Sequence, residues 1–124
     1  IKAMTKNRIQ VDGARVLVMG LAFKENCPDL RNTRVVDVVK ELKEYDCQVD
    51  VYDPVVTPEE ARNVYGITLT EKPSIGSYDS IILAVAHTMF KDMGVGKVHE
   101  LGKNSHILYD LKYIFPKEAV DLRL

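Results

Sequence analysis

The segment 16–31, with the sequence VLVMGLAFKENCPDLR, contains two cations, Lys24 and Arg31, seven residues apart. A loop that folds back on itself could direct both toward one anionic ligand, and a guanidinium offers a two-pronged donor to phosphate. The pattern therefore predicts a phosphorylated ligand. The same spacing also fits a solvated Lys24 and an Arg31 that pairs with Asp29 or Glu25.

Cysteine chemistry is a second possibility in this loop. Cys27 could act as a nucleophile only if a base lowered its pKa, and no histidine lies near it in the sequence. We therefore expect a structural or incidental role for Cys27. Cys27 and Cys47 form neither a CxxC motif nor a disulfide framework, which fits a reducing compartment.

Other polar residues follow apolar segments further along the chain. His87 could reach a ligand, although a histidine at a strand end is more often a buried polar support, and the three histidines lack metal-ligand spacing. We expect no metal. Asp53 lies where a dinucleotide-binding sheet often carries its ribose-binding acid, yet the first loop reads GLAFKE and not GxGxxG, so we expect no self-sufficient NAD site. Lys112, beside Asp110, is a third candidate cation or a solvated strand-end lysine.

Composition limits the kind of protein. The 124 residues are 46% hydrophobic and 28% charged, which fits one globular domain. A formal charge of −1 argues against a nucleic-acid or membrane-surface protein. The sequence has no apolar run of about 20 residues and no apolar core of a signal peptide, so we expect a cytoplasmic protein. Because the chain begins with Ile, we expect a fragment of a longer protein.

Apolar patterning alternates between strand and helix. Strands are predicted at 16–21, 48–52, 67–70, 79–86 and 106–109. Helices are predicted at 33–45, 58–65 and 89–101, the last interrupted by glycines, and residues 1–14 resemble the end of a helix and a linker. In the first of these three helices Val35, Val36, Val39 and Leu42 share one face, and Asn32 or Thr33 could cap it.

This alternation predicts parallel strands joined by right-handed crossovers. The expected fold is α/β: a doubly wound, Rossmann-like three-layer sandwich around a parallel five-stranded sheet of order 3-2-1-4-5. Loops 23–32, 87–88 and 110–112 then gather at the carboxyl ends of the first, fourth and fifth strands, which is where open α/β sheets bind ligands.

A resemblance follows from these residues. The stretch GLAFKENCPDLRNTRVVDVVKELKEYDCQVDVYDP is similar to the start of the C-terminal domain of the UDP-glucose/GDP-mannose dehydrogenase family, with its G-x-x-F-K-x-x-x-x-D-x-R core and V-x-V-Y-D-P strand. The similarity continues through AVAH and ILYDLK to about residue 115, and NCPDLRN resembles the branch that oxidises UDP-N-acetylhexosamines. It implies that residues 1–13 are the exit of a preceding helical domain and that 14–124 are the nucleotide-sugar-binding domain.

The resemblance also implies an activity: NAD-dependent oxidation of a UDP-sugar at C6 to the uronic acid, in polysaccharide biosynthesis. By residue-by-residue match, Phe23 and Lys24 fall on positions that contact the UDP-sugar, and Arg31 falls on the position that reaches NAD. Lys112 falls near a substrate-binding arginine of relatives. The catalytic cysteine of such enzymes lies outside this sequence, so no catalytic residue is assigned here and the domain alone is expected to be inactive.

The resemblance implies two partners besides the UDP-sugar: an NAD-binding N-terminal domain of the same chain, and a second copy joined through a central domain. Two other function classes share the architecture. A flavodoxin-like module would need a cluster of acids after its first strand, where this chain has GLAFK. Half of a UDP-sugar transferase or epimerase would be favoured by a full-length chain lacking an upstream GxGxxG.

Overall fold

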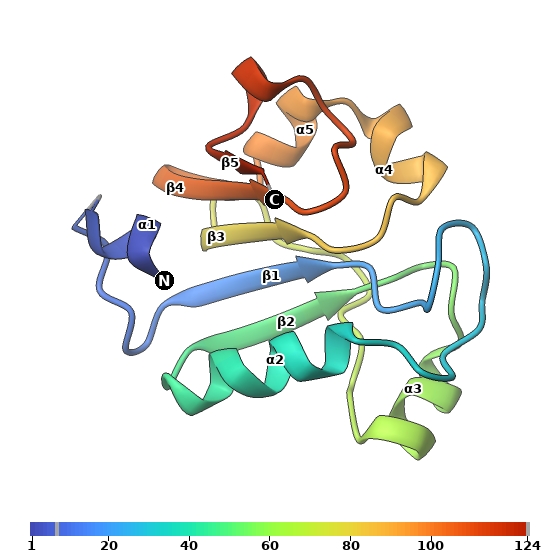
Figure 1. Cartoon of the computed structure of the whole chain (residues 1–124). Coiled ribbons are helices and arrows are strands. Elements are labelled where there is room, and N and C mark those ends of the chain that lie inside the picture. Colours follow the sequence, from blue (N-terminus) through green and yellow to red (C-terminus); the bar gives the residue numbers. More distant parts are fainter. Residues whose placement is uncertain (7, 124) are drawn as a thin grey trace.

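The computed structural model describes residues 1–6 and 8–123. They form three layers, with a sheet between two layers of helices (Figure 1). The strands are β1 (Arg15–Met19), β2 (Gln48–Tyr52), β3 (Tyr78–Leu83), β4 (Gly102–Asp110) and β5 (Leu122–Arg123). The helices are α1 (Lys2–Lys6), α2 (Val35–Glu44), α3 (Pro58–Tyr65), α4 (Thr88–Met93), α5 (Val95–His99) and the 3-10 helix η1 (Lys117–Ala119). All strand pairs are parallel, in the order β2-β1-β3-β4-β5. Within the described residues, no helix is both long and apolar enough to cross a membrane.

Strand β1 explains why helices cover both faces of the sheet. Successive side chains of a strand point to opposite faces, and all four residues after Arg15 are fully buried. Val16 and Val18 belong to the core cluster shared with α2 and α3, whereas Leu17 and Met19 belong to the cluster shared with α4 and α5. The near-continuous apolar run in the sequence is therefore the signature of a strand that is buried on both sides.

Local sequence accounts for the helix boundaries on one face. In α2 the buried side chains are Val35, Val39 and Leu42, three of the four that the sequence placed on one face, whereas Val36 is only partly buried. The Thr33 hydroxyl accepts a hydrogen bond from the Val35 N–H at 3.3 Å, while Arg34 occupies the N-cap position without a side-chain cap. Helix α3 matches the predicted range 58–65: the Thr57 hydroxyl accepts from the Glu60 N–H, and Gly66 ends the helix in the left-handed region.

Two predicted elements differ from the structure, and one strand of the structure was not predicted. The strand expected at 67–70 lies beside β2 as predicted, but only a single bridge joins Leu69 to Val51. The fifth strand of the sheet is instead β5, a two-residue edge strand that sequence patterning missed because it is short and charged. The helix expected at 89–101 is divided into α4 and α5 at Gly94, whose φ of 85° no regular helix allows. The order predicted for the other four strands is confirmed.

The exit of β1 runs close to the exit of β3. Gly20, with φ 104°, donates its N–H to the Tyr52 carbonyl at 2.8 Å. A Cβ at this position would lie 2.6 Å from the Cβ of Val85, so a side chain would force the two strand exits apart. Glycine here sets the direction in which the following loop, 23–32, leaves the sheet.

A buried acid at the end of β2 ties this exit to its neighbours. Oδ2 of Asp53 accepts hydrogen bonds from the N–H groups of Leu21 at 2.7 Å and Ala22 at 2.9 Å, and Oδ1 accepts from the Val55 N–H at 2.9 Å. Oδ2 also lies 3.0 Å from Nε2 of the fully buried His87. Burial raises the pKa of Asp53, but the hydrogen bonds from His87 and the three backbone N–H groups outweigh it and hold the pKa below its usual value.

This network predicts acid sensitivity. Because the folded-state pKa of Asp53 is lower than the unfolded value of about 3.9, its contribution to stability is present above that pH and is lost as pH falls through the folded-state pKa. Asp53→Asn places an amide among donors, so we expect a loss of about 1–3 kcal/mol in the free energy of unfolding at pH 7. Urea unfolding followed by circular dichroism measures it.

The control is Asp92→Asn, which removes an exposed carboxylate on α4. The gap between wild type and Asp53→Asn should narrow in strongly acidic buffer, where the wild-type carboxyl is itself protonated. A gap of the same size from pH 7 down to pH 2.5 would contradict the assignment of the acid sensitivity to Asp53.

Candidate functional site

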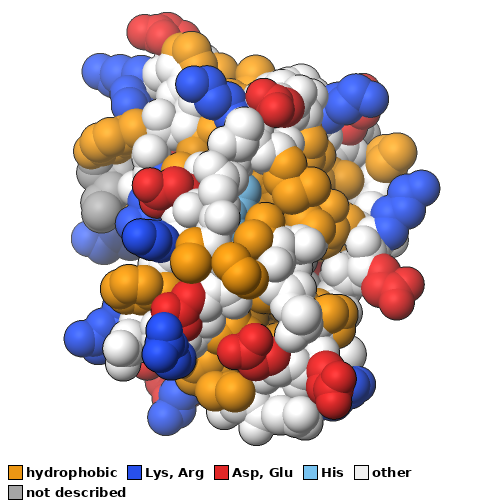
Figure 2. Space-filling view, turned by 90° about the vertical axis from the view of Figure 1, so that its right-hand side faces the viewer, with side chains coloured by type: hydrophobic (Ala, Val, Ile, Leu, Met, Phe, Trp, Pro, Cys, Tyr) orange, Lys and Arg blue, Asp and Glu red, His pale blue; other side chains and the backbone are white. Residues whose placement is uncertain are grey.

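The loops after β1, β3 and β4 meet at the carboxyl edge of the sheet, as the sequence predicted. They enclose a cavity of about 310 Å³, within the range of small-ligand sites. Figure 2 shows this face of the molecule, on which hydrophobic side chains gather over the centre and charged side chains stand largely around the rim. The cavity is lined by Ala22, Phe23, Lys24, Glu25, Asn32, Thr33, Arg34, Val35, Val38, Ala84, Val85, Ala86, Leu111 and Lys112.

The charge of the cavity favours an anion. Its lining includes three cations, Lys24, Arg34 and Lys112, and one acid, Glu25. Across residues 1–6 and 8–123, neither Lys24 nor Lys112 takes part in an ion pair, and Arg34 pairs only loosely with the exposed Asp37, at 3.8 Å. These cations are therefore available to a phosphate group.

An exposed aromatic ring lies beside these charges. Phe23 leaves 54% of its surface exposed although it adjoins the buried Leu21 and Ala22. Its backbone N–H donates to the Asp29 carbonyl at 2.8 Å, which closes the base of loop 23–32. An aromatic face next to cations can pack against a planar base or the apolar face of a sugar while the cations bind phosphate.

Hydrogen bonds hold the tip of the loop to the start of α4. The Asn26 N–H donates to Nδ1 of His87 at 2.9 Å. The Asn26 side chain donates to the Thr88 hydroxyl at 2.8 Å and accepts from the Thr88 N–H at 2.9 Å. Asn26 has a φ of 57°, a conformation that asparagine tolerates better than most residues. The loop is therefore fixed at its tip as well as at its base.

Arg31 lies apart from the predicted substrate residues. It does not line the cavity, and 84% of its side chain is exposed. Its guanidinium forms a two-pronged contact with Asp29, from Nε to Oδ1 at 3.0 Å and from Nη2 to Oδ2 at 3.1 Å. This contact lowers the pKa of Asp29 and raises that of Arg31. Of the two arrangements open from spacing, the pairing with Asp29 is the one present.

The other residues that the sequence singled out include Asp110 and the two cysteines. Asp110 accepts from the N–H groups of Lys112 at 3.2 Å and Phe115 at 2.9 Å, so it shapes the loop after β4. Cys47 is buried, its thiol donates to a backbone carbonyl, and burial raises its pKa. Cys27 is partly exposed in loop 23–32. Among the described residues, no group of three or more His, Cys, Asp or Glu side chains is placed to hold a metal ion.

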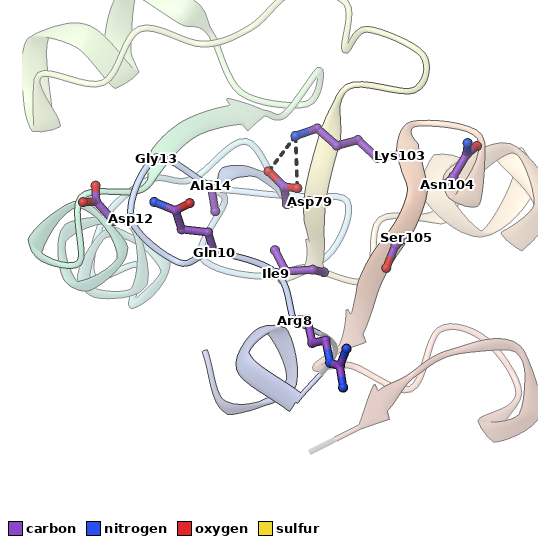
Figure 3. Close-up of a pocket in the computed structure, with 10 residues that line it drawn as sticks. All are labelled: Arg8, Ile9, Gln10, Asp12, Gly13, Ala14, Asp79, Lys103, Asn104 and Ser105. Atoms are coloured by element: carbon purple, nitrogen blue, oxygen red, sulfur yellow. Dashed lines mark hydrogen bonds and ion pairs between the residues drawn. The ribbon is translucent and has the colours of Figure 1, made fainter.

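A larger cavity, of about 640 Å³, lies at the opposite edge of the sheet (Figure 3). Its cations, Arg8 and Lys103, are matched by two acids, Asp12 and Asp79. Nζ of Lys103 lies 3.0 Å from both carboxylate oxygens of Asp79. The balanced charge makes this cavity a weaker candidate for an anionic ligand than the smaller one.

Sequence reasoning missed some residues of the site. Arg34 and Thr33 line the cavity, and the RNTR sequence at 31–34 contained a further cation that could have suggested a role. The hydrogen bonds that join the backbone of Asn26 to His87 and its side chain to Thr88 were also not predicted. The lining of the cavity by Phe23, Lys24 and Lys112 agrees with their predicted proximity.

Comparisons with known proteins agree with this geometry. The sequence profile of the UDP-glucose/GDP-mannose dehydrogenase family, UDP binding domain, matches residues 17–117. UDP-N-acetyl-D-glucosamine 6-dehydrogenases of Pseudomonas aeruginosa and Salmonella typhi are 63% and 53% identical to this chain over all of its 124 residues. The chain spans 29% of the length of each.

Solved structures share the fold. A UDP-D-ManNAc dehydrogenase from Pyrococcus horikoshii superposes with a TM-score of 0.77 at 23% identity, over 98% of this chain and 28% of that one. An NDP-N-acetyl-D-galactosaminuronic acid dehydrogenase from Methanosarcina mazei gives 0.82 at 19% identity, over 95% of this chain and 24% of that one. The profile covers most of the chain: this chain belongs to the UDP-glucose/GDP-mannose dehydrogenase family and matches its UDP binding domain.

Proposed function

We propose that this chain is the C-terminal, UDP-sugar-binding domain of an NAD-dependent nucleotide-sugar 6-dehydrogenase. The proposed substrate is a UDP-N-acetylhexosamine, with UDP-N-acetylglucosamine first because two relatives that match the whole chain carry that name. The product would be the corresponding uronic acid, used in polysaccharide biosynthesis. Family membership favours this function over a flavodoxin-like module or half of a UDP-sugar transferase or epimerase.

One observation carries the proposal. The cavity at the carboxyl edge combines three cations with an exposed aromatic ring, in the position where open α/β sheets bind nucleotides. In the proposed complex Lys24 and Lys112 neutralise the diphosphate, and Phe23 packs against the nucleotide sugar. We propose that the ligand also extends beyond this cavity, toward another domain of the full-length protein.

The residues present do not make a complete NAD site. The loop after β1 lacks GxGxxG. Val85 packs against Gly20, so the space beside this glycine is not open to a pyrophosphate. We propose that an N-terminal domain of the full-length protein would hold NAD, which would supply the hydride acceptor. Arg31, exposed at the outer side of loop 23–32, would reach that cofactor, with Asp29 fixing its orientation.

The proposed role of this domain is therefore to bind and orient. Its strand ends would face the cofactor domain, so that closure holds the sugar C6 near the nicotinamide and excludes water. The thiol nucleophile that this oxidation requires would come from outside this chain. We further propose a cytoplasmic enzyme that forms a homodimer through a central domain.

Product formation tests this proposal. The full-length dehydrogenase is offered UDP-N-acetylglucosamine, UDP-N-acetylgalactosamine, UDP-glucose and GDP-mannose, and NADH is followed by absorbance. We expect about two NADH per sugar with a UDP-N-acetylhexosamine, since oxidation of an alcohol to an acid removes four electrons and each NAD accepts two. Folded enzyme that forms no NADH with any of them would contradict the proposal.

Lys24→Ala should weaken sugar binding. Because this lysine forms no ion pair with any described carboxylate, its loss removes a charge-assisted contact to phosphate, and we expect KM for the UDP-sugar to rise about tenfold or more. KM for NAD should stay within about twofold of wild type. Lys40→Ala, on the exposed side of α2, is the matched control. An unchanged KM for the sugar would remove Lys24 from the site.

Arg31→Ala should act on the cofactor. We expect KM for NAD to rise about fivefold while KM for the UDP-sugar changes by less than about twofold. Asp29→Asn separates the alternatives, because it weakens the ion pair but leaves the guanidinium in place. If Arg31 serves only to hold Asp29, the two variants will show the same kinetic defect.

A further inference from the structure

The contacts of His87 fix its protonation state. Nδ1 faces the N–H of Asn26 at 2.9 Å, and a backbone N–H can only donate, so Nδ1 must carry a lone pair. The ring proton is then on Nε2, which donates to Oδ2 of Asp53 at 3.0 Å. His87 is therefore neutral, with one acceptor and one donor both in use. The edge of its ring also packs against Phe90, with centroids 5.2 Å apart.

This arrangement links three separate segments through one side chain. Asp53 follows β2 and binds the exit of β1, whereas Asn26 is at the tip of loop 23–32. Ala22 and Asn26 are thus both anchored, and only residues 23–25 lie between them. These three residues include Phe23 and Lys24, which line the cavity. Their backbone can vary little while both anchors hold.

We infer that His87, with Asn26, is a positioning residue for nucleotide-sugar binding: it holds the backbone of residues 23–25 so that Phe23 and Lys24 face the ligand. This inference rests on the proposed function. His87 itself is fully buried and does not line the cavity, so it acts through the loop and not by contact with substrate. Preorganisation of this kind lowers the ordering cost that a flexible loop would pay on binding.

A purely supporting role would predict a different pattern. Asp110 provides the comparison, because its carboxylate binds two N–H groups of its own loop, at Lys112 and Phe115. His87 instead reaches Asn26, 61 residues away in the sequence, on the loop that bears the candidate ligand contacts. Loss of a supporting residue would lower stability and affect both substrates, whereas loss of a positioning residue should affect the UDP-sugar selectively.

The test uses the full-length dehydrogenase with paired variants. His87→Phe keeps the ring but removes both hydrogen bonds. His87→Gln restores one acceptor and one donor on a single terminal group. Asn26→Gly removes the side-chain bonds to Thr88 while allowing the positive φ, and it changes an exposed position that the core does not need. Asp46→Gly, at another exposed position with positive φ (63°), is the control for the glycine itself.

Steady-state kinetics and calorimetric titration with UDP are the measurements. We expect His87→Phe and Asn26→Gly to raise KM for the UDP-sugar and the dissociation constant of UDP about tenfold. KM for NAD should stay within about twofold, and His87→Gln should recover to within about threefold of wild type. Asp46→Gly should match wild type.

Two results would overturn the inference. One is a folded Asn26→Gly enzyme with an unchanged dissociation constant for UDP; the other is an equal rise of both KM values in His87→Phe with no recovery in His87→Gln. Failure of the proposed function is distinguishable: wild type would then form no NADH, whereas the UDP titrations would still report on the loop. A wild-type enzyme that bound no UDP would refute both.

Discussion

The buried carboxylate of Asp53 is the interaction on which the carboxyl edge of the sheet depends. It collects donors from the exit of β1, from its own loop and from His87, and so joins the ends of three strands. A carboxylate buried without such donors would be strongly destabilising. The strand ends must therefore keep their relative positions for the charge to be tolerated, and this constraint makes the edge a rigid base for loop 23–32.

The same network leaves the surface cations available. Because Asp53 is satisfied by backbone donors and a neutral imidazole, no lysine or arginine is needed to neutralise it. Lys24 and Lys112 therefore remain on the rim of the cavity without ion-pair partners in the described part of the chain. An anionic ligand can then bind these lysines without first breaking a salt bridge. Arg31 differs, because it is already paired with the carboxylate of Asp29.

Much of the fold follows from local patterns in the sequence. The apolar run at 16–21 predicts a buried strand, which the structure has as β1, and Thr57 and Gly66 bound α3 by ordinary capping. Local patterns fail where pairing depends on distant partners. Strand β5 forms because Asp121 exchanges hydrogen bonds with Leu108, through its carboxylate and its N–H, and nothing within the short sequence DLRL encodes that contact. The strand expected at 67–70 also depends on a distant partner. It can pair only with β2 at the edge of the sheet, and it forms one bridge there.

The candidate site divides in the same way. Topology alone brings loops 23–32, 87–88 and 110–112 together, so Phe23, Lys24 and Lys112 could be grouped from the sequence. The partner of each donor could not, because Asn26 meets His87 only when β1 and β3 are adjacent and both loops have the right path. Gly20, through its close contact with Val85, and Asn26, through its positive φ, both set the path of the loop that follows β1. Gly20 and Asn26, which carry no charge, thus determine the position of the loop that bears Lys24.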